Sequence, residues 1–121
     1  MNSFSEIERE TISSLLRKRY GKNVSFEEVE CELDLGSGPQ PFPAIYWFER
    51  GANFVLVKAR GKYRSQFFYT EADHYGTGRM EYDDLEDCVK TLLQVQADHE
   101  SAAVPLPPSA EIEDYHGPSM I

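Results

Sequence analysis

The chain has 121 residues, of which 40% are hydrophobic, and carries a formal net charge of −9 with an isoelectric point of about 4.7. This length suits one domain with an ordinary core, and the acidity argues against binding nucleic acid or an anionic membrane through basic residues. Residues 1–6 lack the basic and apolar parts of a signal peptide, and no stretch reaches the length of a membrane span. Two cysteines make a disulfide scaffold improbable, so the sequence predicts reduced thiols in a cytoplasmic protein.

Residues 5–20 are predicted to form the first helix. Ser5 and Glu8 have the spacing of a capping box, and acidic residues in the first turn suit the positive end of the helix dipole. Gly21 follows the last turn and is predicted to end the helix.

Four strands are predicted over residues 24–35, 44–49, 54–59 and 63–69. Glycines and prolines in residues 36–43 predict a break in regular structure after the first strand. The later breaks, at 50–53 and 60–62, are short and contain glycine, which favours hairpins. The sequence therefore predicts an antiparallel meander.

The last helix is predicted to begin at Asp83, with Asp83 and Glu86 as its cap. Its apolar positions follow the three-four spacing of a helix that lies on a sheet: Leu85, Cys88, Val89, Leu92 and Val95. Residues 102–121 are proline-rich and acidic, so they are predicted to be a disordered tail outside a single domain of residues 1–101.

Helix, four strands and helix make an α+β two-layer sandwich, a four-stranded antiparallel meander with the N- and C-terminal helices on one face. A two-residue first hairpin loop and a three-residue second one are expected and fix which side chains share a face, and one residue more or less would swap the faces. The side predicted to meet the helices carries Val29, Cys31, Leu33, Tyr46, Phe48, Val55, Val57 and Phe67. The opposite side is predicted to carry Trp47, Phe54, Leu56 and Phe68, with Lys58 and Arg64 beside them.

This second set of side chains is the sharpest candidate site. Aromatic and aliphatic side chains ringed by charge, as with Trp47 beside Lys58 and Arg64, have the makeup of a protein contact surface. Dimerisation through the same face and a merely solvated face are the alternatives.

An acidic row is formed by Glu28, Glu30, Glu32 and Asp34, on every second residue of the first strand. Like charges along a strand repel, so they need water, cations or a basic partner. Three explanations follow: pairing with the basic run Lys58, Arg60, Lys62 and Arg64 or protection of a strand edge, binding of a basic protein, or weak metal binding. The row joins the candidate partner-binding residues.

Chemistry-bearing motifs are sparse elsewhere. The sequence has no Cys-x-x-Cys and no histidine pair with ligand spacing, so it predicts no zinc site and no cofactor. Cys88 and His74 are the residues that a nucleophilic enzyme would use, but Cys88 fits a helix core position. No catalytic residue is assigned, and the chain is expected not to be an enzyme.

The order of elements and the acidic first helix and strand resemble the frataxins, which are acidic iron-binding proteins. The matching carboxylates are Glu6, Glu8, Glu10, Glu28, Glu30 and Glu32. The resemblance implies weak iron binding as the alternative function, although Trp47 lies in an earlier strand than the frataxin pattern has. Small acidic immunity proteins, inhibitors and effector chaperones share the size, charge and build. The expected function is accordingly a small acidic protein-binding module that holds another, basic protein through its open sheet face and acidic row.

Overall fold

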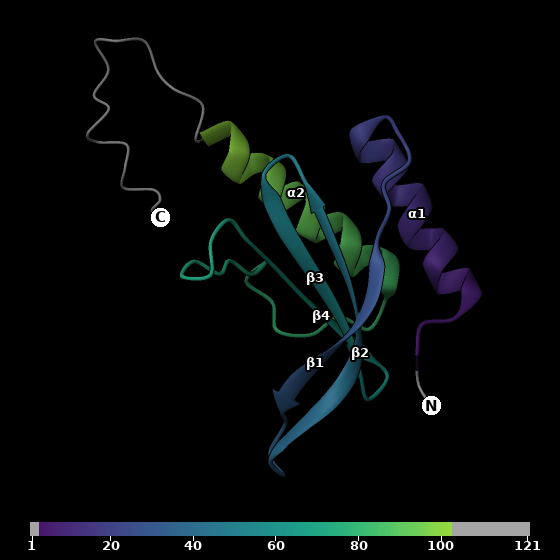
Figure 1. Ribbon diagram of the computed structural model, residues 1–121, viewed down its shortest axis with the longest axis vertical. Helices are drawn as coiled ribbons and strands as arrows, with labels where there is room; N and C mark the ends of the chain where they lie inside the picture. Colours follow the sequence, from purple (N-terminus) through teal and green to yellow (C-terminus); the bar gives the residue numbers. More distant parts are fainter. Residues whose placement is uncertain (1–2, 103–121) are drawn as a thin grey trace.

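The computed structural model of the chain describes residues 3–102. The elements are α1 (Glu6–Tyr20), β1 (Glu27–Asp34), β2 (Pro39–Glu49), β3 (Ala52–Ala59), β4 (Lys62–Phe68) and α2 (Leu85–Ala102). The four strands form one antiparallel sheet in the order β1-β2-β3-β4, and both helices lie on the same side of it (Figure 1). The predicted α+β meander with two helices is confirmed. Ala102 belongs to α2, and the rest of the predicted tail lies outside the described residues.

Local signals in the sequence place α1 correctly. The Glu8 amide nitrogen lies 3.1 Å from Ser5 Oγ, and the Ser5 amide nitrogen lies 2.8 Å from Glu8 Oε1, which completes the capping box. Gly21 has a left-handed backbone (φ 74°) and donates to the Arg17 carbonyl at 2.8 Å. Both predicted ends of this helix are confirmed.

The cap of α2 differs from the predicted one by a single residue. Asp84 Oδ2 accepts a hydrogen bond from the Asp87 amide at 3.0 Å, so Asp84 rather than Asp83 caps the helix. Asp83 instead pairs with Lys62 at the start of β4. Consecutive aspartates in the sequence make both positions plausible caps, and this tertiary ion pair favours the later one.

Both later connections are two-residue hairpin loops, Arg50–Gly51 and Arg60–Gly61. All four residues have positive φ, between 55° and 78°, as a type I′ turn requires. The predicted hairpins are confirmed. The second loop is shorter by one residue than the three-residue loop used to predict the faces, because Ala59 pairs directly with Lys62.

The break predicted over residues 36–43 is wrong, because β2 already begins at Pro39. The turn is confined to residues 35–38, where Asp34 Oδ1 accepts from the amides of Gly36 and Gly38 at 2.9 and 3.2 Å. Prolines 39, 41 and 43 alternate along β2, so their nitrogens all point to one edge. The residues between them keep their donors for the ladder with β1, and the strand survives.

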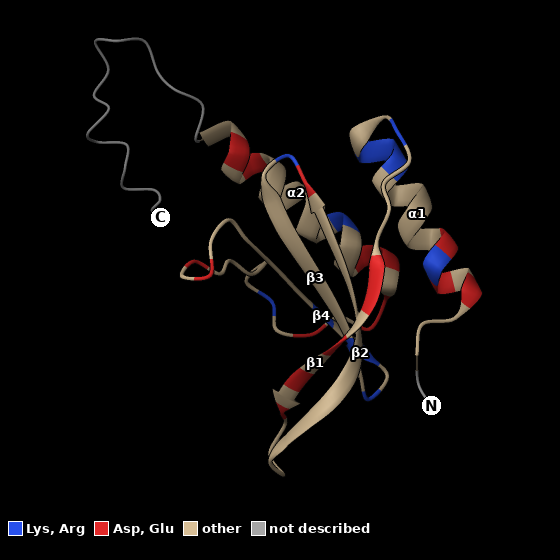
Figure 2. Ribbon diagram, in the orientation of Figure 1, with Lys and Arg blue, Asp and Glu red and all other residues tan. Residues whose placement is uncertain are grey.

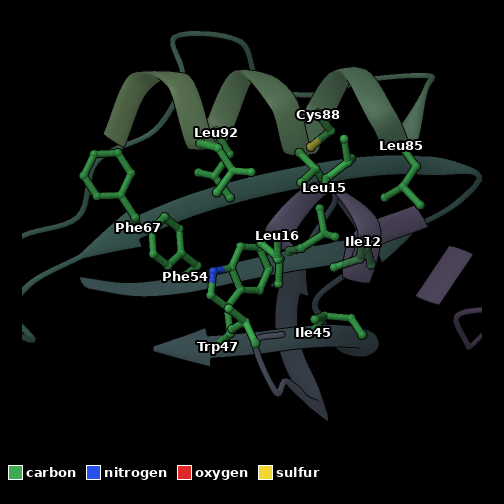
Figure 3. Close-up of a cluster of buried hydrophobic side chains, with 14 of the residues drawn as sticks. Ile12, Leu15, Leu16, Ile45, Trp47, Phe54, Phe67, Leu85, Cys88 and Leu92 are labelled. Atoms are coloured by element: carbon green, nitrogen blue, oxygen red, sulfur yellow. The ribbon is translucent and has the colours of Figure 1, made fainter. Parts of the chain in front are cut away.

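The helices cover the face opposite to the predicted one. Trp47 is 1% exposed and stacks on Phe54, with ring centroids 5.0 Å apart, beneath α1 and α2 (Figure 3). Leu56 is buried in the same core. The prediction that Trp47, Phe54 and Leu56 lie on the open face is therefore wrong. The core is closed by side chains of both helices, among them Ile12, Leu15, Leu16, Leu85, Cys88, Val89 and Leu92.

The grouping of β2 and β3 side chains was nevertheless right. Trp47 pairs with Phe54 and Tyr46 with Val55, as the two-residue loop predicts. Alternation defines two sets of side chains but does not say which set is inside, and here both sets are apolar. Phe67 is buried and Phe68 lies on the open side as predicted, only because the inverted face and the shorter second loop cancel.

Candidate protein-binding face

The face of the sheet that the helices leave uncovered, called the open face below, is largely apolar. Ala44 and Val57 at its centre are buried, whereas Val29 is 37% exposed and Phe48 55% exposed. Register places the following side chains on it: Val29, Cys31, Leu33, Phe42, Tyr46, Phe48, Val55, Val57 and Phe68. All of these except Phe42 and Phe68 were predicted to meet the helices, and that prediction is wrong. Phe68 was predicted on the open face and lies there.

A cavity of about 440 Å³ opens on this face. Its lining comes from Cys31 and Leu33 of β1, Val55 and Val57 of β3, and Gln66 of β4, with Met80 and its neighbours of the loop 76–80 as the far wall. The volume lies within the range of cavities that hold a small molecule or a few side chains of a partner. Met80 is exposed, so the wall itself offers a flexible apolar contact.

Arg64 is one of the polar residues that line the cavity. Its guanidinium is 3.0 Å from the Glu81 carboxylate, which balances its charge. Its Nε is buried and has no hydrogen-bond partner among residues 3–102. Burial raises the pKa of the Cys31 thiol, so this side chain stays neutral and apolar at physiological pH. The cavity therefore combines apolar side chains of β1 and β3 with polar ones of β4 and the loop 76–80, and Arg64 Nε is a buried donor on its wall without a partner among residues 3–102.

The acidic row lies along the free edge of the sheet, on the helix side (Figure 2). The turn between β1 and β2 projects beyond both helices, which leaves the outer carboxylates in water (Figure 1). Glu28 binds Arg9 of α1 at 2.9 Å and Asp34 caps the turn. Glu30 and Glu32 are exposed and form no ion pair within the described part of the chain.

Pairing between the acidic row and the basic run of β3 and β4 is not observed, because β2 separates them. Lys58 instead reaches Glu8 of α1, with 2.8 Å between Nζ and Oε1. Lys62 binds Asp83, and Arg64 binds Glu81. The explanation of the acidic row by cross-strand pairing is therefore wrong, and protection of the strand edge or contact with a basic partner is left.

Of the predicted site residues, Phe68 and Arg64 lie on the open face and the four acidic ones along its free edge. Lys58 lies under α1, where its Nζ also binds the Ser3 carbonyl at 3.2 Å. The site residues that the prediction missed include Val29, Phe42, Phe48 and Met80.

A signal for the correct face was present in the sequence. Three amide side chains, Gln40, Asn53 and Gln66, share the parity of the open face, whereas the only tryptophan lies on the other side. Uncharged polar side chains are more often exposed than large aromatic ones.

The candidate catalytic residues do not meet. Cys88 is fully buried on α2, and burial raises its pKa to about 11, which removes the thiolate that a nucleophile needs. His74, on the loop after β4, packs against Phe68 with tilted rings whose centroids are 4.8 Å apart. Among residues 3–102, no three His, Cys, Asp or Glu side chains converge as metal ligands.

Neither helix of the described chain is both long and apolar enough to cross a bilayer. Comparison with models of protein families, with curated proteins and with solved structures found no match to this chain. The geometry of the open face is therefore the basis for the functional conclusion.

Proposed function

We propose that this protein is a small acidic binding module that holds another protein on the open face of its sheet. The observation that carries the proposal is an apolar face with a cavity that neither α1 nor α2 covers. Contiguous apolar surface of this kind on a soluble domain marks an interaction site more often than a solvated one. The proposed setting is the cytoplasm, where both cysteines stay reduced.

Charge supports a basic partner. The net charge is −9, and Glu30 and Glu32 have no internal counterion within residues 3–102. Their field accelerates encounter with a positive surface and slows encounter with a negative one. An immunity- or inhibitor-like role, in which the module masks a basic toxin or enzyme, is the most concrete form of the proposal.

The test is affinity capture with wild type, Phe48→Ser and Ile7→Ser. Phe48 is exposed on the open face, and Ile7 is 75% exposed on α1, so both changes remove a similar exposed apolar side chain without opening the core. We expect Phe48→Ser to lose the captured partner and Ile7→Ser to retain it, as judged by quantitative mass spectrometry. Equal recovery with both variants would place the contact elsewhere and contradict the proposal.

Dimerisation stays a prediction, now through a different surface. Trp47 is buried inside one copy, so its fluorescence cannot report a dimer that forms on the open face. Sedimentation of wild type and Phe48→Ser at the same concentrations separates self-association from binding of a different protein. Iron binding is not proposed further, because no observation in the described residues favours it.

A further inference from the structure

The two outer strands of the sheet differ in how their free backbone groups are satisfied. The outward amides of Tyr63 and Phe67 in β4 donate to the carbonyls of Tyr82 and Tyr75 at 2.9 Å, and both return bonds are 2.8 Å. The segment after β4 therefore pairs with this edge at two places and blocks it.

β2 also has an unpaired stretch where it extends past the end of β3, and prolines protect it. Pro39, Pro41 and Pro43 point their nitrogens to the edge away from β1, because β1 pairs along this whole stretch and a proline cannot donate to it. An added strand would find acceptors here and no donor. This edge is closed to strand pairing by its chemistry.

The outer edge of β1 has neither protection. Eight consecutive residues pair with β2 without a bulge, from Glu27 opposite Tyr46 to Asp34 opposite Pro39. Glu30 and Glu32 stand opposite prolines, so they belong to the pairs that exchange no hydrogen bonds, and their own N–H and C=O groups point outward. Within residues 3–102 no backbone group bonds to these outward groups.

The side chains beside this edge form two rows of different chemistry. The acidic row faces the helix side, and Val29, Cys31 and Leu33 face the open side, where the last two line the cavity. A strand added here would place its own alternate side chains next to these two rows. Its matching sequence has lysine or arginine at every second position and apolar residues between them.

We propose that an extended segment of a partner protein, with basic and apolar residues in alternation, adds to β1 as a fifth strand. Its main chain bonds the outward groups of Glu30 and Glu32, its cations face the acidic row, and its apolar side chains extend over Leu33 toward the cavity. The inference rests on the proposed function and specifies its binding mode. A second copy of this chain fits poorly, because antiparallel pairing of two β1 strands in one sheet sets glutamate opposite glutamate.

The test uses fluorescent eight-residue peptides with lysine and valine in alternation. Two N-methylated versions carry the methyl groups on the lysine amides or on the valine amides. Antiparallel addition predicts at least about tenfold weaker binding for methylation at lysine, which faces Glu30, and less than about twofold change for methylation at valine. A peptide with glutamate for lysine is expected not to bind.

Two protein variants test the same edge from the other side. Glu30→Gln removes only the charge, whereas Glu30→Pro also removes the outward donor and leaves the ladder with β2 intact. We expect Glu30→Pro to bind the lysine–valine peptide at least about fivefold more weakly than Glu30→Gln. Circular dichroism checks that both variants fold. If Glu30→Pro does not fold, the N-methylated peptides still test whether a strand adds to β1.

Each outcome separates the inference from the proposed function. Equal binding of both N-methylated peptides, or tight binding of the glutamate peptide, would overturn strand addition at β1. Absence of binding by the unmodified peptide at millimolar concentration would overturn it as well. In these cases the capture experiment with Phe48→Ser still judges contact through the open face.

Discussion

The β4 edge and the β1 edge belong to one continuous sheet but differ in whether their outward backbone groups are hydrogen-bonded. At β4, Tyr75 and Tyr82 occupy the outward backbone groups, and Tyr82 is buried in the core. At β1, charged side chains are the only protection that residues 3–102 provide. The difference teaches that strand protection by charge is conditional, because it repels a neutral or acidic strand and attracts a basic one.

The loop that closes the β4 edge also shapes the binding face. Residues 76–80 of this loop form a wall of the cavity, opposite Cys31 and Leu33 of β1. Closing one edge of the sheet thereby builds a hollow next to the other edge. The two halves of the sheet also form different ion pairs with α1. Glu8 of α1 pairs with Lys58 of β3, near the closed β4 edge, and Arg9 of α1 pairs with Glu28 of β1, at the free edge.

The largest expected loss of stability comes from a change at the β4 edge, which the loop after β4 closes. Tyr82→Ala removes a buried ring together with the hydrogen bond between its hydroxyl and that of Thr77 and the cation–π contact with Arg79. We expect the free energy of unfolding to fall by about 3–5 kcal/mol in urea titrations, the range for large-to-small changes in a core. The matched change on the open edge, Glu32→Ala, should cost less than about 0.5 kcal/mol. Similar losses at both edges would contradict the comparison.

The second largest loss of stability is expected from Glu8 of α1, which bonds Lys58 of β3 and Tyr63 of β4. Burial alone would raise its pKa, but hydrogen bonds from Lys58 and Tyr63 lower it below the ordinary value of 4.5. Its stabilising contribution is therefore present at neutral pH and is lost as pH falls through the folded-state pKa.

We expect Glu8→Gln to reduce the free energy of unfolding by about 1.5–3 kcal/mol at pH 7, the range for hydrogen bonds to a charged group. The difference from wild type should shrink as the pH falls below 4.5, because the wild-type carboxylate becomes protonated as well once the pH passes its lowered folded-state pKa. Urea titrations at pH 7 and pH 3 measure both values. A difference that stays constant or grows on acidification would contradict this assignment.

The smallest effect on stability is expected at the ion pair between α1 and β1, formed by Arg9 and Glu28. Arg9 and Glu28 are each 40% exposed in their ion pair, so water and salt screen their attraction. We expect Glu28→Gln to change the free energy of unfolding by less than about 1 kcal/mol, and less again in 0.5 M salt. If Glu28→Gln lowered the free energy of unfolding as much as Glu8→Gln, the contacts of α1 with β1 and with β3 would be equally stabilising, which would contradict the comparison.

The sequence predicted what local chemistry decides. The capping box at Ser5, the glycine at the end of α1 and the hairpins within residues 50–53 and 60–62 each depend on neighbouring residues, and all are present. Only the length of the second loop was wrong, by one residue. The α+β order followed from them.

What failed depends on contacts between distant segments. The pairing of Tyr75 and Tyr82 with β4 joins residues that no periodicity connects, and the choice of the covered face depends on how two helices dock. The acidic row misled the assignment, because it shares a face with Ile45 of the core. Glu28 is accommodated there by its ion pair with Arg9 of α1, and the outer carboxylates lie toward the turn that projects beyond the helices. Charge on a strand therefore marks access to water and not the side opposite the core.

The most direct test is residue-resolved amide hydrogen exchange by NMR, with and without the lysine–valine peptide. In the free protein we expect slow exchange at the outward amides of Tyr63 and Phe67 and fast exchange at those of Glu30 and Glu32. Saturating peptide should slow Glu30 and Glu32 at least about tenfold and leave Tyr63 unchanged. Protection of Glu30 and Glu32 in the free protein, or no added protection in the bound one, would contradict an open edge at β1 that accepts a partner strand.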